Sequence, residues 1–151
     1  MSACNPSEVS LRAQCATCVL LVRPAAFGYN VDTAATNHFQ HWADAQPHSL
    51  QQLARAQFDA LCAALEAAGV RTVIGEDSAE PPKPDALFPN NWVSWHHDGT
   101  VVLYPLQAAS RRPERRPELL AAVEQQAGFR CRRLIDLSGR EQQGRYLEGT
   151  G

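Results

Sequence analysis

Three kinds of polar side chain in this sequence are suited to binding a small polar ligand: amides, arginines and a carboxylate followed by glycines. The amides are Asn90 and Asn91 in PDALFPNNW, next to the apolar side chain of Phe88. An asparagine amide offers one acceptor and two donors, so the pair could bind a planar urea or guanidine group along its edge. Asparagine also tolerates left-handed backbone conformations, so the same two residues could simply close a turn.

The arginines follow in RRPERR, as Arg111, Arg112, Arg115 and Arg116. A guanidinium group binds a carboxylate through two parallel hydrogen bonds, which a lysine cannot match. The alternative is a solvated basic surface whose charges pair with the neighbouring Glu114 and Glu118. An RNA-binding patch would need interleaved aromatic residues and a basic balance, whereas the net charge of this chain is −2.

The carboxylate is Glu148 in YLEGTG. The glycine that follows it removes side-chain bulk, so a small substrate could lie against the backbone there. A glycine-rich turn without any ligand is the alternative.

The histidines and cysteines do not form a convincing metal site. Cys15-x-x-Cys18 lacks a second pair at zinc-finger spacing. His38 and His41 could share a helical face near His48, but no carboxylate completes a zinc set. Successive strand residues point to opposite faces, so His96 and His97 are interpreted as residues at the end of a hairpin, not as a catalytic pair. We expect neither a metal nor a cofactor.

Length and composition are those of one globular domain. The chain has 151 residues, of which 44% are hydrophobic and 20% charged, and such a domain buries roughly 70% of its unfolded surface. Five cysteines at irregular spacing, Cys4, Cys15, Cys18, Cys62 and Cys131, fit the cytoplasm better than an oxidising compartment. The run ATCVLLV is too short to span a membrane and is predicted to be a buried strand, with a signal peptide as the alternative.

The first half of the chain predicts a strand, a helix and a second strand. Residues 1–14 are patternless and are expected to form a loose tail. A strand is predicted over 17–22, followed by a loop through FGYNVDT. The helix is predicted to begin at Ser49, with Ser49 and Gln52 as a capping box, and to end at Gly69. A strand over 70–74 and the proline-rich connector EDSAEPPKP follow.

The second half predicts a hairpin, a helix and another strand. In NWVSWHHDGTVVLYP, Asp98-Gly99 is a two-residue hairpin signal between apolar runs. A helix is expected from Pro117 to Gly128, then a strand in CRRLIDL and the start of another in YLEG. Strands alternating with helices in both halves favour an α/β fold.

Taken in order, VLLVRPAAFGYN, FPNNWVSWHHDGTVVLYP, RRPERR and DLSGREQQGRYLEGTG resemble the amidinotransferase or arginine-deiminase-related superfamily, most closely its citrulline-hydrolase-like branch. The similarity runs from about Val19 to Gly151. It implies a pentein fold, a five-bladed α/β propeller of ββαβ units around a central cavity. It also implies attack on a guanidine or ureido carbon by a cysteine, with a histidine moving protons.

The resemblance assigns four substrate-binding residues. Asn91 falls where related deiminases have an aspartate, and an amide suits a ureido carbonyl better than a guanidinium group. Arg111, with Arg112 beside it, corresponds to the clamp on the substrate's α-carboxylate. Glu148 corresponds to the acidic residue beside the catalytic histidine. The three positions Asn91, Arg111 and Glu148 must then converge on one cavity.

In the family, the histidine and the nucleophilic cysteine lie after this motif, so no catalytic residue is expected within these 151 residues. The resemblance then implies that residues 15–151 are the N-terminal portion of one pentein domain, about two to two and a half of five blades. We expect a guanidino- or ureido-group hydrolase family, a chain inactive alone, and a small ligand such as citrulline or arginine. Self-association through open propeller edges is expected, and binding to nucleic acid or membrane is not. The alternative is a remnant or a weak amino-acid-binding module.

Overall fold

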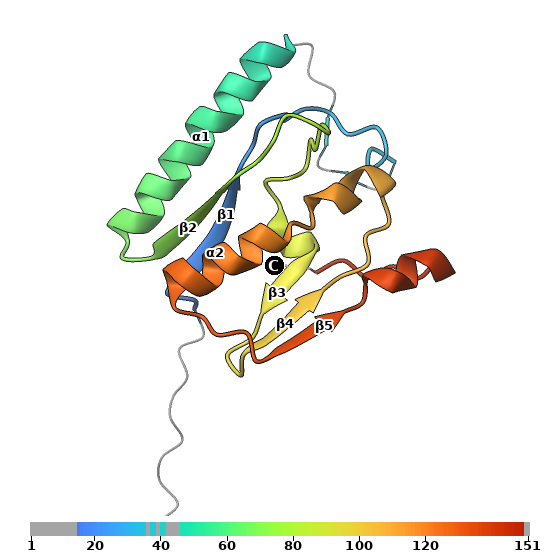
Figure 1. Ribbon diagram of the computed structural model, residues 1–151. Helices are drawn as coiled ribbons and strands as arrows, with labels where there is room; N and C mark the ends of the chain where they lie inside the picture. Colours follow the sequence, from blue (N-terminus) through green and yellow to red (C-terminus); the bar gives the residue numbers. More distant parts are fainter. Residues whose placement is uncertain (1–14, 36, 39, 42–45, 150–151) are drawn as a thin grey trace, which may run out of the picture.

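The computed structural model describes residues 15–35, 37–38, 40–41 and 46–149, and the predicted tail over 1–14 lies outside these ranges. Two small sheets form the body (Figure 1). The first pairs β1 (Cys18–Arg23) with β2 (Arg71–Glu76) in parallel, in the register Cys18 to Arg71 through Arg23 to Glu76. Parallel strands need a crossover, and α1 (Pro47–Ala67) lies within the one that joins them.

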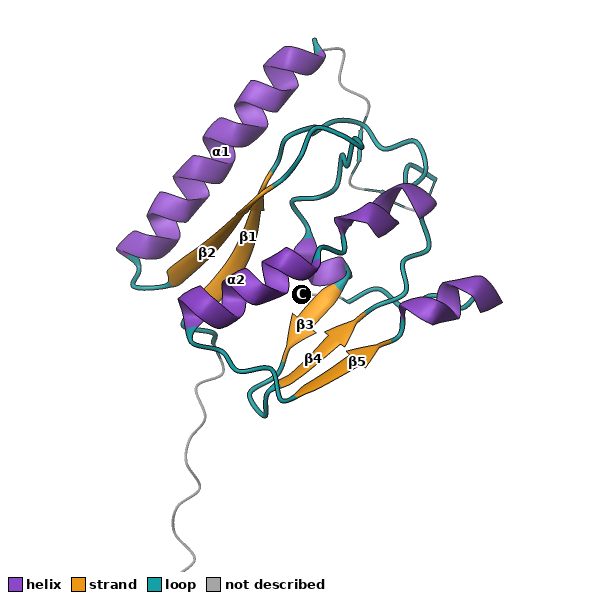
Figure 2. Ribbon diagram, in the orientation of Figure 1, coloured by secondary structure: helices purple, strands orange, loops and turns teal. Residues whose placement is uncertain are grey.

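The second sheet has the order β3-β4-β5 (Figure 2). β3 (Val93–Trp95) and β4 (Thr100–Leu103) are antiparallel, and β5 (Arg133–Asp136) runs parallel to β4. The crossover from β4 to β5 contains α2 (Pro117–Ala127). Both halves therefore contain a strand-helix-strand unit, and the predicted α/β fold is confirmed. The number of propeller blades stays a prediction.

The core lies where α2 meets both sheets. Seven buried side chains form its centre: Val22, Ala86, Trp92, Val93, Val101, Leu106 and Leu119. Gly75 in β2 permits this packing, because a Cβ atom at that position would collide with the side chain of Leu119 in α2. No helix in the described part of the chain is long and apolar enough to cross a membrane.

The predicted capping box of the first helix is wrong. α1 begins at Pro47 after the N-cap residue Gln46, and no side chain caps it. Ser49 already lies in the first turn, with its backbone N–H donating to the Gln46 carbonyl at 2.9 Å. Gln52 contacts Nε2 of His48 at 2.9 Å instead of reaching back to Ser49. The proline explains the earlier start, because its fixed φ suits the first helical position.

The strand boundaries and the last element also differ from the prediction. β1 starts one residue later than expected, and β2 extends beyond Ile74 to Glu76. The chain forms η3 (Ser138–Gln143), and YLEG is not a strand. Leu147 donates its N–H to the Pro105 carbonyl at 3.1 Å, and Gly149 donates to the Asn91 carbonyl at 2.9 Å. These two bonds go to different segments, so no ladder forms.

The hairpin is confirmed, but its turn is one residue longer than predicted. The N–H of Gly99 donates to the His96 carbonyl at 2.9 Å, and the His96 N–H donates to the Thr100 carbonyl at 2.9 Å. His97 and Asp98 are therefore the central residues, and Gly99 is the left-handed one with φ of +87°. This is the three-residue loop that ends in a glycine bulge. The Asp98 carboxylate accepts the Thr100 N–H at 2.9 Å, which lowers its pKa.

We expect Gly99→Ala to destabilise the protein by about 1 to 2 kcal/mol, the cost of a left-handed backbone for an L-residue. The added Cβ would also lie 2.9 Å from the carbonyl oxygen of Arg130. The free energy of unfolding in urea measures the loss. Gly139→Ala is the matched control, because a Cβ there has nothing within 4 Å. Equal stabilities for the two variants would contradict the assigned turn.

Candidate functional site

Loops from four parts of the chain enclose a cavity of about 960 Å³, at the upper end of the roughly 300 to 1,000 Å³ usual for ligand sites. Asn91 lies in η1 (Pro89–Asn91) just before β3, and Arg111 lies in η2 (Ala109–Glu114) after β4. Both line the cavity together with Glu148. The convergence of these three residues, on which the resemblance depends, is therefore present.

Arg111 is the centre of the site and is 5% exposed. Its Nε and Nη2 atoms donate to the two carboxylate oxygens of Glu114 at 2.9 and 2.8 Å. Nη1 donates to Oδ1 of Asn91 at 3.0 Å. Nη2 also donates to the backbone carbonyls of Asp85 at 3.3 Å and Phe88 at 3.5 Å. One guanidinium group thus joins η2 to the segment that leads into β3.

These contacts change the interpretation of Arg111. A guanidinium group has five N–H donors, and the bonds to Glu114, Asn91 and the two carbonyls use all but one on Nη1. That nitrogen lies 3.8 Å from Oε2 of Glu148. Arg111 cannot offer a free pair of donors to a substrate carboxylate, so the geometry favours a positioning role over the expected clamp.

Glu114, at the end of η2, is fully buried. Burial raises its pKa to about 7, and the hydrogen bonds and charge of Arg111 oppose this rise. Burial alone would lower the pKa of Arg111, but the hydrogen bond and charge of Glu114, together with the charges of Asp85 and Glu148, outweigh burial and raise that pKa. The pair therefore keeps Arg111 charged at every ordinary pH.

Asn91 uses both ends of its amide within the protein. Oδ1 accepts from Arg111, and Nδ2 donates to the backbone carbonyl of Gly149 at 3.1 Å. The Gly149 N–H in turn donates to the Asn91 carbonyl. Asn91 therefore holds the 148–149 segment against η1, which limits its freedom to bind a ureido group.

Glu148 is held between two segments at the edge of the cavity. Its Oε1 atom accepts the backbone N–H of Gln107 at 3.3 Å, and its Oε2 atom faces Arg111. Its side chain is 32% exposed, so the carboxylate is accessible from the cavity. A Cβ at Gly149 would collide with the carbonyl oxygen of Asn90. Gly149 thus allows its backbone to lie close to the backbone of Asn90, where the sequence had suggested a close approach by a substrate.

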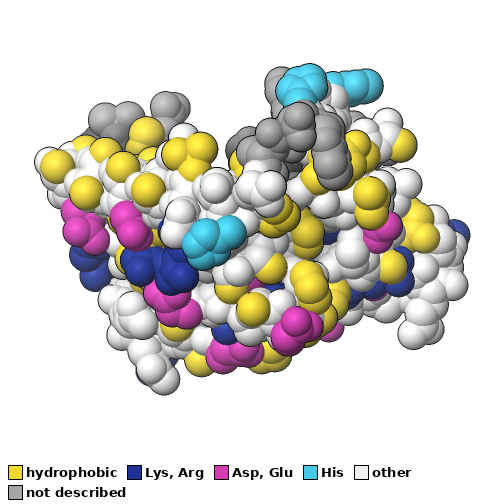
Figure 3. Space-filling model, turned by 90° about the horizontal axis from the view of Figure 1, so that it is seen from above, with side chains coloured by type: hydrophobic (Ala, Val, Ile, Leu, Met, Phe, Trp, Pro, Cys, Tyr) yellow, Lys and Arg dark blue, Asp and Glu magenta, His cyan; other side chains and the backbone are white. Residues whose placement is uncertain are grey.

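Arg112 does not line the cavity and contacts Glu141 instead, with Nε to Oε2 at 3.1 Å. Arg115 forms two hydrogen bonds with Glu141, at 2.6 and 3.1 Å. Arg116 pairs with Glu118 at 2.7 Å. Every arginine of RRPERR therefore pairs with a carboxylate, and Arg112 and Arg115 share that of Glu141. In the face shown in Figure 3, basic side chains lie beside acidic ones, which does not favour a nucleic-acid surface.

Two acidic residues of the cavity were missed by the sequence analysis. Asp85 is buried, lines the cavity, and has Oδ2 3.7 Å from Nε of Arg111. Asp32, from the FGYNVDT loop, also lines the cavity. Asp85 stands in PDALFPNNW, three residues before Phe88. The available signal in the sequence is an acidic residue in the same short motif as the apolar Phe88 and the two amides.

The histidines and cysteines that the structure describes do not line this cavity. Among the described residues, no three His, Cys, Asp or Glu side chains are placed to hold a metal ion. His96 contacts the hydroxyl of Ser94 at 3.0 Å.

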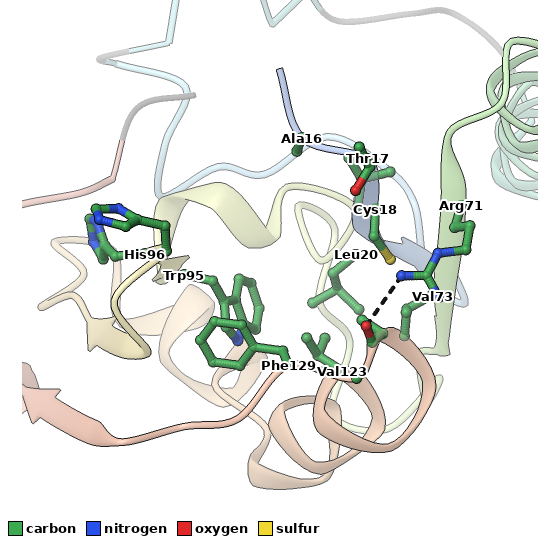
Figure 4. Close-up of a pocket in the computed structure, with 14 residues that line it drawn as sticks. Ala16, Thr17, Cys18, Leu20, Arg71, Val73, Trp95, His96, Val123 and Phe129 are labelled. Carbon is green, nitrogen blue, oxygen red and sulfur yellow. Dashed lines mark hydrogen bonds between the residues drawn. The ribbon is translucent and has the colours of Figure 1, made fainter. Parts of the chain in front are cut away.

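A second pocket of about 380 Å³ shares no lining residue with the first. Figure 4 shows Trp95, Phe129 and Leu20 in it, with Arg71 hydrogen-bonded to the Ala127 carbonyl at its edge. This second pocket is mostly apolar and lacks carboxylates.

The comparisons with known proteins agree with this geometry at the level of family. The family model for eukaryotic N,N dimethylarginine dimethylhydrolase matches residues 23–151. No curated protein and no solved structure matches the chain. Because Asp32, Asp85 and Glu148 line the cavity of about 960 Å³, we call it the acidic cavity. The matched range contains every described residue that lines it. The chain therefore belongs to the N,N dimethylarginine dimethylhydrolase family, a pentein-superfamily family of guanidino-modifying hydrolases.

Proposed function

We propose that the acidic cavity binds the guanidinium group of an arginine derivative. The observation that carries this proposal is the charge of the cavity. Arg111 brings one positive charge against the carboxyl groups of Asp85, Glu114 and Glu148, all within 4 Å of its nitrogens. The cluster stays negative even when one of these groups is protonated. A guanidinium group has only donors, so carboxylates are its natural partners.

Asp85 and Glu148 are the proposed substrate-binding residues, with Asn91 and Arg111 holding them in place. Both carboxylates line the cavity, and Phe88 offers an apolar surface beside them. Arg112 is proposed only as a support for the Gln107 backbone, to whose carbonyl it donates at 3.4 Å. A ureido ligand such as citrulline is the second candidate, because Asn91 faces the same cavity.

We further propose that this chain binds the substrate but does not hydrolyse it alone. Among the described residues that line the cavity there is neither a cysteine nor a histidine. A nucleophile and a proton carrier are what covalent attack on a guanidine carbon requires. The described cysteines, Cys15, Cys18, Cys62 and Cys131, are free thiols placed elsewhere. Free thiols suit the cytoplasmic location that is part of the proposal.

In this proposal residues 15–151 are the N-terminal portion of a pentein domain. Leu134 in the edge strand β5 is 51% exposed, and Leu147 is 57% exposed. Exposed apolar side chains beside an edge strand favour association between chains. The alternative, a remnant that binds amino acids weakly, would expose the same apolar side chains.

Calorimetric titration of the full chain with N,N-dimethylarginine, arginine and citrulline at pH 7.5 tests the proposal. We expect the two cationic ligands to bind more tightly than citrulline. Asp85→Asn should weaken cation binding by at least about tenfold, the value of one hydrogen bond to a charged group. Citrulline binding should change little, because the ureido group carries no charge.

Asp59→Asn is the matched control, since Asp59 is half-exposed in α1 and pairs with Arg23. Tighter binding of citrulline than of arginine would favour the ureido alternative. Binding of none of the three ligands would refute the proposed function. Release of ammonia or dimethylamine by this chain would refute only the claim that it is inactive alone.

A further inference from the structure

Asn30 is a buried polar residue at the centre of the loop between β1 and α1, and it is 3% exposed. It does not line the acidic cavity, but Asp32 and Thr33, two and three positions after it, do. A buried amide is costly unless its donors and acceptors are satisfied. The partners of Asn30 are therefore informative about its role.

The side chain of Asn30 joins the loop to Asp85. Nδ2 donates to Oδ2 of Asp85 at 2.7 Å, between residues 55 positions apart. Oδ1 accepts the backbone N–H of Asp32 at 3.1 Å and the hydroxyl of Ser110 at 3.4 Å. One amide thus contacts the loop, the segment before η1, and η2. These are three of the segments that enclose the cavity.

The backbone carbonyl of Asn30 holds the same loop in a closed conformation. It accepts the N–H of Ala34 at 3.1 Å and Nε2 of Gln40 at 2.9 Å. The hydroxyl of Thr33 donates to this carbonyl at 3.3 Å and lies 3.4 Å from Oδ2 of Asp85. The loop is therefore built around Asn30, and its polar groups converge on one oxygen of Asp85.

We propose that Asn30 is a positioning residue that fixes the orientation of the Asp85 carboxylate toward the ligand's guanidinium group. This rests on the proposed function. A carboxylate held by a neutral donor at one oxygen cannot rotate freely and keeps its full negative charge. Arg111 lies 3.7 Å from the same oxygen and Glu114 lies beyond it. Without Asn30, Asp85 would turn toward Arg111 and away from the cavity.

Asparagine suits this position better than the isosteric aspartate. An ionised carboxylate at residue 30 would face Asp85 at hydrogen-bond distance, and two like charges so close repel each other. A protonated carboxyl group would instead donate its O–H to Asp85 and replace the amide. Asn30→Asp is therefore a variant whose positioning function depends on pH.

The test measures the affinity of each variant for N,N-dimethylarginine from pH 5 to pH 8. At each pH this affinity is divided by that of the wild type. We expect Asn30→Asp to bind nearly as well as the wild type at pH 5. At pH 8 it should bind about 10- to 100-fold more weakly, because the donated bond to a charged group is replaced by repulsion. Asn30→Ser, whose hydroxyl is too short to reach, should be about tenfold weaker at every pH.

Gln125→Glu is the charge control, because it adds one carboxylate to the exposed face of α2, and its affinity ratio should stay flat. Thermal unfolding at each pH ensures that only folded protein is compared. An Asn30→Asp ratio that is flat, or that rises with pH because of the added negative charge, would overturn the positioning role. Failure of the wild type to bind would instead refute the proposed function.

Discussion

Arg111→Met is expected to lower the free energy of unfolding by about 3 to 5 kcal/mol at pH 8, the cost of breaking a buried ion pair by removing one partner. The methionine would fill much of the space but would leave Glu114 buried without its two hydrogen bonds. It would also release the carbonyls of Asp85 and Phe88 and the amide of Asn91. Urea unfolding followed by circular dichroism measures the loss.

The loss should be smaller at pH 6 than at pH 8. Burial already raises the pKa of Glu114 to about 7 with Arg111 present. Without the guanidinium group that pKa rises further, so at pH 6 the carboxyl group is neutral and cheaper to bury. In the wild type, too, Glu114 stabilises the folded state more at pH 6 than at pH 8. The folded state binds this proton more tightly than the unfolded chain, so the contribution of Glu114 to stability falls as pH rises from about 4.5 through 7.

Two further variants separate the pair from its surroundings. Arg140→Met removes an exposed arginine of η3 and should change stability by less than about 0.5 kcal/mol. The double variant Arg111→Met with Glu114→Leu should recover most of the stability, because a buried ion pair can be replaced by apolar groups of similar volume. It should not recover ligand binding, since Asn91 and Glu148 would still lack the guanidinium group. A double variant as unstable as Arg111→Met would contradict this account.

Gly149→Ala is expected to weaken binding of N,N-dimethylarginine by about 100-fold, the upper range for a lost contact with a charged group. The added Cβ would collide with the Asn90 carbonyl oxygen and lie 3.0 Å from Cε2 of Tyr104. Neither a backbone oxygen nor a packed ring can move easily. The 148–149 segment must shift instead, and the carboxylate of Glu148 leaves the cavity with it.

Stability should fall far less than affinity in Gly149→Ala, by about 1 to 2 kcal/mol, because only local bonds to Asn91 are lost. Calorimetry and thermal unfolding of the same preparation measure both effects. Gly139→Ala is again the control, since a Cβ there meets nothing within 4 Å. Wild-type affinity in Gly149→Ala would show that Glu148 does not contact the ligand.

Together these variants test whether the stability of the site and its affinity for a ligand depend on different residues. The Arg111–Glu114 pair supports the walls of the cavity, whereas Asp85 and Glu148 supply its charge. All but one of the N–H donors of Arg111 are bonded within the protein, so we infer that this residue positions the cavity wall and does not clamp a substrate carboxylate. A negative cavity built around a buried positive charge favours a cationic ligand over a neutral one of the same shape.

The local elements and the residues suited to ligand binding could be predicted from the amino-acid sequence. Alternation of strand and helix patterns predicted the α/β fold, and Asp98-Gly99 marked the hairpin, because helix periodicity and turn chemistry depend on near neighbours. The residue types at Asn91, Arg111 and Glu148 indicated a polar ligand site for the same local reason. The predicted start of α1 was wrong because two helix-start signals lie close together. Pro47 marks the observed start, whereas the capping-box pattern of Ser49 and Gln52 predicted a later one.

The partners of each polar side chain, by contrast, follow from long-range contacts that the sequence pattern does not reveal. Arg111 is engaged by Glu114 and by segments 20 or more positions away, and Asp85 is held by Asn30 across 55 positions. Arg112, next to Arg111 in sequence, faces Glu141 instead. No local pattern encodes such choices, because the orientation of a buried charge follows from partners that folding brings together.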